Sequence, residues 1–436
     1  MLLVAIIIPS WHYWADATRL QPMYEMHFAT VLESRFKETD VLISIIDLRG
    51  IALDQQVRHI AEHDLYLYWI MKSGDYSEVE FIVKELRRHY SNAKHAAGGT
   101  HVDMCTDECR QVFDAVLLGP GEETFTNIIH DTLAGGMKKE YKDDFNKIHY
   151  GDYLFMRRHF LPKTAIVNYD LFGKYGDNIR GTCVLFSRGC NFKCAYCVYN
   201  IPNKIQLKPL KMITEEIEYL KKEYQVQAIN LKDEIALPVS PKISIPFLET
   251  IARSNIIWRG QTTVWGATEE HLKLASESGC VELAIGVESA SEIVREVVCK
   301  KITDKEIKTF IDNCHKFKIR VKMCLILGLP GEPQDIVKKT IQFIEDMVPD
   351  YLSVSGFDPF PGSPIYNNMA YYGIKYIDKD WGKHAHLLYR FSNKEEVGLP
   401  FEYEKENRWG KTFTREQIAQ NLCEIQSYSR DKGMIY

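Results

Sequence analysis

The sequence lacks the features of membrane and nucleic-acid-binding proteins. Its one N-terminal apolar run, Leu2–Ile8, is followed at once by Pro9 and is far shorter than a bilayer span. No basic residue precedes this run, so it predicts neither a signal peptide nor a membrane anchor. Acidic residues exceed basic ones only by 59 to 54, which gives no electrostatic footprint for duplex nucleic acid or an anionic membrane. We therefore expect no nucleic-acid partner and no membrane partner.

The sequence also lacks a disulfide framework. Eleven cysteines in 436 residues are an odd number, and most of them are scattered. Cys105 and Cys109 lie four residues apart, and we interpret them as structural thiols because no further cysteine is near. Without a secretory signal, the thiols predict a cytoplasmic protein in which metal ligation is the special use for any cluster.

The first 133 residues alternate apolar strands with amphipathic helices, which is the signature of a parallel α/β layer. Strands are expected at Leu3–Ile8, Val41–Asp47, Asp64–Met71, Lys94–Ala97 and Ala115–Leu118. This pattern predicts a Rossmann-like, doubly wound sheet over residues 1–133, with a ligand beyond the carboxyl ends of the strands.

Glycines gather at those predicted strand ends. Gly98 and Gly99 follow the fourth strand, and Gly119 and Gly121 follow the fifth, just before Glu122. Because glycine tolerates positive φ, such positions let the backbone approach a ligand closely.

The rest of the chain divides into three further parts. Residues 134–180 break the pattern and predict an interdomain linker. Residues 181–375 hold six βα units, which predict a partial (β/α)6 barrel of the TIM type. Residues 376–436 predict a small α-rich C-terminal extension, in which Trp381, His384, His386, Tyr389 and Trp409 form no readable pattern.

The sharpest motif is a group of three cysteines after the first barrel strand. Cys190, Cys194 and Cys197 have the spacing C-x₃-C-x₂-C, and the catalytic face of such barrels lies at this end of the strands. A zinc site or a fully ligated cluster would need a fourth protein ligand, for example Cys183 or a distant histidine. Three ligands to an iron–sulfur cubane leave one iron open.

This triplet and its setting resemble the radical S-adenosylmethionine (SAM) enzymes. The resemblance implies that Cys190, Cys194 and Cys197 hold a 4Fe–4S cluster whose open iron binds SAM, and that reduction cleaves SAM to a 5′-deoxyadenosyl radical. It extends over about 190 residues in the expected order. It implies the following SAM-binding positions: Tyr196, Asp233, Arg259, Gly286, Glu288, Ser289, Gly328 and Pro330.

Each of these positions has a plainer interpretation. Asp233 and its neighbour Glu234 could be a solvated carboxylate pair, and Arg259 an ordinary surface arginine. The Glu288–Ser289 pair could be a helix N-cap, and the Gly-x-Pro-Gly-Glu segment at Gly328 a turn before a helix.

A doubly wound domain before such a barrel resembles the cobalamin-binding branch of this superfamily. The resemblance implies cobalamin contacts at Gly98, Gly99, Gly119, Gly121 and Glu122, although Pro120 replaces the usual acidic residue. No D-x-H-x-x-G motif supplies a histidine to cobalt. The Trp11–Trp14 loop could face the corrin or pack at a domain interface, and His12 is interpreted as a surface histidine.

The resemblance implies a cobalamin-dependent methyltransferase that acts on an unactivated carbon of a small-molecule or peptide substrate, with flavodoxin or ferredoxin as electron donor. The alternative is a radical SAM cyclase or rearrangement enzyme, with or without cobalamin. A third possibility is that the N-terminal domain binds no cofactor and serves as an interaction surface. No catalytic residue and no particular substrate follow from the sequence.

Overall fold

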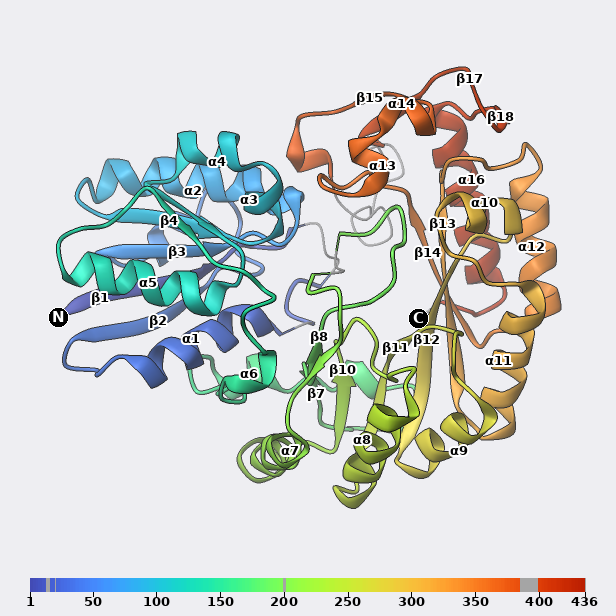
Figure 1. Cartoon of the computed structure of the whole chain (residues 1–436), viewed down its shortest axis with the longest axis horizontal. Coiled ribbons are helices and arrows are strands. Elements are labelled where there is room, and N and C mark those ends of the chain that lie inside the picture. Colours follow the sequence, from blue (N-terminus) through green and yellow to red (C-terminus); the bar gives the residue numbers. More distant parts are fainter. Residues whose placement is uncertain (13–15, 20, 199–200, 385–398, 436) are drawn as a thin grey trace. The chain divides into compact units, whose positions relative to one another are not determined.

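The computed structural model describes the chain except for residues 13–15, 20, 199–200, 385–398 and 436. The chain forms two compact units (Figure 1). The first unit is Met1–Asn168 with Asp380–Ala385, and the second is Tyr169–Lys379 with His386–Tyr436. Among the described residues, no helix combines the length and the apolar composition needed to cross a membrane.

The first unit contains a six-stranded parallel sheet with the order β2-β1-β3-β4-β5-β6. The strands are β1 (Leu2–Ile8), β2 (Val41–Asp47), β3 (Leu65–Trp69), β4 (Lys94–Gly98), β5 (Ala115–Leu118) and β6 (Glu140–Lys142). The helices are α1 (Met23–Arg35), α2 (Tyr76–His89), α3 (Thr100–Met104), α4 (Thr106–Val112), α5 (Gly121–Leu133) and α6 (Lys163–Ile166). The predicted Rossmann-like sheet is confirmed.

Side chains of β3 alternate between two hydrophobic cores, one on each face of this sheet. Tyr66 and Tyr68 belong to the core shared with α2, whereas Leu67 and Trp69 belong to the core shared with α1 and α5. The strand β6 lies inside the stretch 134–180, for which the sequence predicts a linker. The strand has three residues, of which only Tyr141 is buried, so it carries no readable alternation.

The second unit contains an open barrel of six parallel strands with the order β14-β13-β12-β11-β10-β7. These are β7 (Gly181–Val184), β10 (Ala228–Leu231), β11 (Ile257–Thr262), β12 (Cys280–Glu288), β13 (Arg320–Leu327) and β14 (Tyr351–Gly356). The intervening helices are α7 (Leu210–Tyr224), α8 (Pro241–Arg253), α9 (Glu269–Glu277), α10 (Glu292–Val297), α11 (Asp304–Lys316) and α12 (Ile336–Met347). This architecture confirms the predicted partial barrel.

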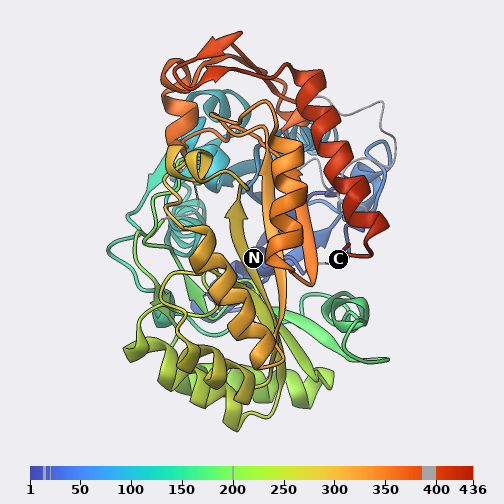
Figure 2. The same ribbon diagram turned by 90° about the vertical axis from the view of Figure 1, so that its right-hand side faces the viewer.

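The C-terminal end of the second unit is helical, with two small antiparallel sheets of two strands each. Its elements are α13 (Pro364–Asn367), α14 (Met369–Tyr372), β15 (Ile374–Ile377), β16 (Phe401–Tyr403), β17 (Glu406–Asn407), β18 (Gly410–Lys411) and α16 (Arg415–Asp431). The long helix α16 begins at a capping box formed by Thr414 and Gln417, and it packs on α12 and β14 (Figure 2).

Candidate active site at the strand ends of the open barrel

The three cysteines lie in a loop that a short hairpin closes. The hairpin strands β8 (Ser187–Arg188) and β9 (Gln206–Leu207) pair antiparallel, and the loop from residue 189 to residue 205 runs between them. At the start of this loop Gly189 has φ +94°, and a Cβ there would lie 2.2 Å from the carbonyl oxygen of Lys204. Only glycine fits this close approach, so the loop closure depends on it.

The middle of the cysteine loop is attached to two other segments of the barrel. The backbone amide of Ala195 donates to the carbonyl of Val298 at 2.9 Å, and the carbonyl of Ala195 accepts from the amide of Ile365 at 3.0 Å. Ala195 is 1% exposed, between Cys194 and Tyr196. These bonds therefore fix the loop against the end of α10 and the start of α13.

Three half-buried thiols share this loop. Burial raises the thiol pKa of both Cys190 and Cys194, and the Lys300 ammonium acts in the opposite direction on each. Three thiolates on one loop suit an iron–sulfur cluster that keeps one iron open to another ligand. A cation beside them favours the thiolate form that ligation requires.

Glu288, the last residue of β12, accepts two hydrogen bonds at the same oxygen. The Tyr196 hydroxyl donates to its Oε1 at 2.7 Å, and Lys300 Nζ donates to that oxygen at 3.1 Å. The side chains of Glu288 and Lys300 are only 8% and 10% exposed. Burial alone would lower the pKa of Lys300, but the Glu288 carboxylate and the nearby Cys194 thiol raise it, so the lysine stays charged.

The backbone at Glu288 is strained. Its φ is +72°, in the left-handed region that side-chain-bearing residues rarely adopt, and the pairing of β12 with β13 shifts register between Gly286 and Glu288. A Cβ at Gly286 would lie 2.2 Å from Glu288 Oε1 and 3.0 Å from Lys300 Nζ. The bulge and the glycine together aim the carboxylate at the lysine, and such strain concentrates at functional sites.

Ser289 contributes to the turn that follows Glu288. Its Oγ accepts from the amide of Ser291 at 3.2 Å, and its carbonyl accepts from the buried guanidinium of Arg295 at 2.7 Å. The N-cap of α10 is Ser291, so the interpretation of the Glu288–Ser289 pair as an N-cap is wrong. Ser289 therefore holds the turn, and its hydroxyl is engaged with the backbone.

The two acidic residues after β10 hold the entry to the cysteine loop. Asp233, 1% exposed, accepts hydrogen bonds from the amides of Phe186 and Ser187, and Glu234 accepts from the amide of Gly189 at 3.1 Å. Burial raises the pKa of Asp233 to about 6 and that of Glu234 to about 7. The interpretation as a solvated carboxylate pair is therefore wrong for Asp233.

Arg259 does not lie at a strand end. The strand β11 continues to Thr262, and Arg259 pairs in register with Glu282, six residues before Glu288 on β12. At ~3.3 Å per residue this is about 20 Å along the strand. Arg259 is 5% exposed and lies over the ring of Phe172 at 5.0 Å, so the surface interpretation is wrong as well.

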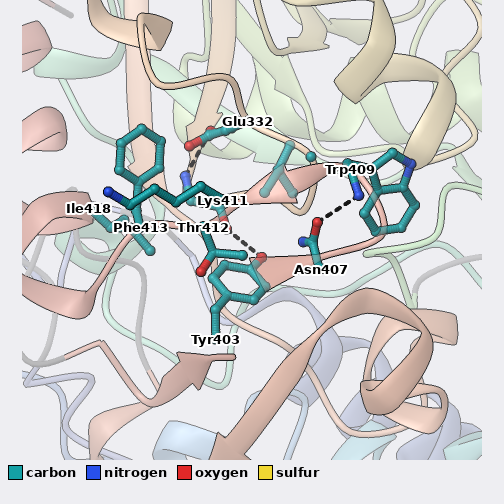
Figure 3. Close-up of a pocket in the computed structure, with 11 residues that line it drawn as sticks. Glu332, Tyr403, Asn407, Trp409, Lys411, Thr412, Phe413 and Ile418 are labelled. Atoms are coloured by element: carbon teal, nitrogen blue, oxygen red, sulfur yellow. Dashed lines mark hydrogen bonds between the residues drawn. The ribbon is translucent and has the colours of Figure 1, made fainter. Parts of the chain in front are cut away.

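The turn after β13 is enclosed by the C-terminal extension (Figure 3). Gly328 has φ +91°, and its amide donates to Glu332 Oε1 at 2.8 Å. Its carbonyl accepts from the hydroxyl of Tyr403 at 2.8 Å, and Trp409 and Ile418 also line this small pocket. Burial raises the pKa of Glu332 to about 8. The segment that includes Pro330 is thus both a turn before α12 and a pocket wall.

The strand-end glycines of the first unit face protein atoms. A Cβ at Gly98 would lie 2.8 Å from the Trp69 ring, and one at Gly121 would lie 2.6 Å from the Phe28 ring. A Cβ at Gly99 would lie 2.6 Å from the Ile70 carbonyl oxygen, and one at Gly119 would lie 2.2 Å from the Asp143 carbonyl oxygen. These glycines therefore make room for the protein's own backbone and aromatic rings.

Two further predicted contacts of the first unit have protein partners. Glu122, 1% exposed, lies 2.9 Å from the Nε2 atom of buried His27. The ring of Trp11 lies 5.5 Å from the Arg49 guanidinium, and His12 Nδ1 lies 3.2 Å from Glu78 Oε2. Tyr13 and Trp14, like His386 and Tyr389, lie outside the described residues.

No sequence motif predicts Lys300 as part of this site. It follows α10 by three residues in a stretch without motif spacing, so only the fold brings it to Glu288. Glu78 was also missed: it accepts from the amide of Ser10 at 2.6 Å and from Gln56 Nε2 at 2.8 Å. Glu78 belongs to α2 but lies near the end of β1. Nothing in the helical spacing of α2 indicates that this carboxylate is buried there.

The open barrel and its cysteine loop lie in the part of the chain that matches a known family. Residues 184–344 match the radical SAM superfamily, as the cysteine motif predicts.

Relatives of known sequence include proteins named as methyltransferases. The chain is 28% identical over 293 residues to an uncharacterized methyltransferase of Pyrococcus horikoshii, covering 62% of this chain and 61% of the relative. It is 25% identical over 316 residues to the bacteriochlorophyllide d C-12(1)-methyltransferase of Chlorobaculum tepidum, covering 68% and 64%. The chain thus matches about three fifths of the length of these relatives.

A solved structure shares the fold of almost the whole chain. The radical SAM methyltransferase TsrM from Kitasatospora setae, solved with cobalamin and a [4Fe–4S] cluster bound, superimposes with a TM-score of 0.71 at 14% identity. The match covers 99% of this chain and 92% of that chain. At this identity the likeness shows the fold alone.

Proposed function

We propose that the protein is a cobalamin-dependent radical SAM methyltransferase acting on an unactivated carbon of a small molecule. The observation that carries the proposal is the junction of the three-cysteine loop with the buried Glu288–Lys300 pair at the strand ends of a six-stranded open barrel. The methyltransferases among the relatives and the two-unit fold support the methyl-transfer outcome over ring closure or rearrangement.

The donor set at the barrel fits the cluster and SAM. Cys190, Cys194 and Cys197 would hold the cluster, and Lys300 offsets the negative charge that thiolates and cluster bring into a half-buried loop. Glu288 offers a carboxylate to the amino or hydroxyl groups of SAM, and Lys300 fixes its orientation. When bound, these cofactors supply the radical that opens the C–H bond, and cobalamin supplies the methyl group.

The first unit fits cobalamin only in part. Protein atoms fill the spaces at the four strand-end glycines, so those positions do not fit a nucleotide tail. The polar strand-end groups suit the amide side chains of a corrin: within the described part of the chain, the buried Gln56 Oε1 has no hydrogen-bond partner, and its Nε2 donates to Glu78. Ser10, Gln56 and Glu78 would face the corrin.

The proposed chemistry implies an electron-donor protein and a cellular compartment. The cluster needs a one-electron donor such as flavodoxin or ferredoxin, and both the cluster and the thiols suit a reducing cytoplasm. The C-terminal extension, which already encloses the Gly328 turn, would contribute to recognition of the substrate.

The test uses the full chain, purified without oxygen and supplied with cobalamin, a reductant and SAM. Mass spectrometry then follows 5′-deoxyadenosine, which reports radical cleavage, and S-adenosylhomocysteine, which reports methyl transfer. We expect both products, with the second dependent on added cobalamin. The Cys194→Ala variant should make no 5′-deoxyadenosine. Formation of 5′-deoxyadenosine without any S-adenosylhomocysteine would favour the cyclase or rearrangement reaction instead.

A further inference from the structure

A second group of metal-ligating side chains lies in the first unit, on the helices that follow β4. His101 is in α3, Glu108 is in α4, and Cys105 lies between the two helices. Cys105 ends α3 and precedes α4, so the three residues lie around the junction of two short helices. One ligand atom from each residue lies within 4.8 Å of those of the other two.

The imidazole of His101 is oriented so that one ring nitrogen can bind a metal ion. Its Nδ1 atom lies 2.9 Å from Ser73 Oγ, and the residue is 1% exposed. Among the described residues, its Nε2 atom is buried and has no hydrogen-bond partner. Metal-bound histidines characteristically bond their second ring nitrogen in this way, whereas a buried unpaired nitrogen is costly.

Glu108 is also oriented from outside the group. The indole Nε1 of Trp381 donates to both of its carboxylate oxygens, at 3.0 and 2.9 Å. The Trp381 ring also lies 5.2 Å from the His101 ring, edge to face. Trp381 comes from the C-terminal part of the sequence but belongs to the first unit. The group therefore has supporting contacts behind both an imidazole and a carboxylate.

We propose that His101, Cys105 and Glu108 bind a zinc-class divalent cation, at a site separate from the cysteine loop of the barrel. An imidazole, a thiolate and a carboxylate together suit a borderline cation such as Zn²⁺, with the fourth position open to water. Tetrahedral zinc would bring the ligand atoms to ~3.5 Å from one another, so small side-chain rotations complete the site. The exposed side of Glu108 provides the path of entry.

The cation would also fix a remote segment of the chain. Because Trp381 bonds both oxygens of Glu108, ordering the carboxylate orders the Asp380–His384 segment that packs on the first unit. The site is separate from the cysteine loop, since none of its ligands belongs to the barrel.

The first experiment measures zinc retained by the full chain in which Cys190, Cys194 and Cys197 are replaced by alanine, which removes the other thiol cluster. The probe is zinc chloride in competition with a chromogenic chelator, followed by metal analysis. We expect stoichiometric zinc, and a loss of affinity of at least 100-fold on adding Cys105→Ala. The matched control is Cys109→Ala, because Cys109 is fully buried in the hydrophobic core and is not one of the three residues whose ligand atoms lie together. It should retain zinc fully.

Two further variants separate ligation from structure. Trp381→Phe removes the indole donor but keeps an aromatic ring, and it should weaken zinc binding 10- to 100-fold, as loss of an outer contact does. Cys105→His should restore most of the affinity lost in Cys105→Ala. Circular dichroism checks that each variant is folded. Absence of zinc in the parent chain, or equal retention by Cys105→Ala and Cys109→Ala, would overturn the proposal.

Discussion

The strand ends of the second unit carry charge and strain, whereas those of the first unit carry glycines that serve packing. At the end of β12, Glu288 is held at positive φ and pairs with buried Lys300 beside the cysteine loop. At the ends of β4 and β5, the space beside Gly98 and Gly121 is taken by aromatic rings. Residues at the ends of parallel strands therefore have different roles in the two units: they form a charged site in the second and pack against aromatic rings in the first.

This difference shows how to read a glycine at a strand end. Gly286 of the barrel leaves room for the Glu288–Lys300 pair, so its small size serves a polar site. Gly99 leaves room for the backbone of Ile70, so its small size serves the fold. What fills the space beside the glycine decides its role, and the residue type alone does not.

The largest effect is expected in the cysteine loop. Replacing Cys190, Cys194 or Cys197 by alanine removes one of the three proposed cluster ligands and should abolish iron binding and SAM cleavage together. Cys183→Ala is the matched control, because Cys183 is fully buried in β7, outside the loop. Iron analysis and the visible absorbance of the reconstituted chain give the answer. Equal loss of iron in Cys183→Ala would show that the three-ligand assignment is wrong.

The glycine comparison predicts the next largest effect, in the first unit. Gly99→Val places a Cβ against the Ile70 backbone at φ +105°, so it should destabilise the chain by several kcal/mol even without cobalamin. Phe28→Ala should cost about 3–5 kcal/mol, because the ring fills the core. Gly50→Ala is the control: φ is +75° and nothing lies within 4 Å, so about 1 kcal/mol is expected.

Urea unfolding of these variants, followed by fluorescence without cobalamin, measures each cost. If Gly99→Val unfolded at the same urea concentration as the natural chain yet failed to bind a corrin, the space beside Gly99 would be part of the corrin site. The proposed difference between the strand ends of the two units would then be wrong.

A smaller effect is expected at Glu288. Glu288→Gln removes the charge that Tyr196 and Lys300 contact and should weaken SAM binding by about 1–3 kcal/mol, with iron content unchanged. The matched control is Glu282→Gln on the same strand, whose carboxylate accepts from Tyr175 near the opposite end. Calorimetric titration with SAM distinguishes them. Unaltered affinity in Glu288→Gln would remove this residue from the site.

The smallest effect concerns pH. Burial raises the pKa of Glu332 from 4.5 to about 8, so between these values the folded chain holds a proton that the unfolded chain has released. Stability supplied by this group is therefore present below pH 4.5 and is lost as the pH rises toward 8. Glu332→Gln should flatten this part of the dependence of the melting temperature on pH. If the melting temperature of the variant fell equally steeply with rising pH, other buried carboxyls would be responsible for the dependence.

Much of the fold could be predicted because hydrophobic periodicity is a local signal. The strands β1, β2 and β12 are long apolar runs, and the cysteine spacing is a local motif. Strand ends are harder, because β11 continues through Gly260 to Thr262 although glycine is unfavourable inside a strand. Pairing with β12 extends β11 as far as Thr262, and a local sequence pattern does not contain this pairing.

The side chains of the site that escaped prediction are those brought in by tertiary structure. Lys300 meets Glu288 only because α10 turns the chain back, and the bulge that aims Glu288 arises from pairing between β12 and β13. Trp381 reaches Glu108 from 273 residues away in the sequence. No spacing rule spans such distances, so these contacts appear only in the folded chain.

The most direct test of the proposed function is the metal and corrin content of the chain purified without oxygen from cells supplied with cobalamin. The proposal predicts iron for one 4Fe–4S cluster together with stoichiometric cobalt, and a corrin absorbance that Cys194→Ala leaves intact while losing its iron. A chain that cleaves SAM and converts its substrate with iron but without cobalt would contradict the proposal and leave a cobalamin-free radical enzyme in its place.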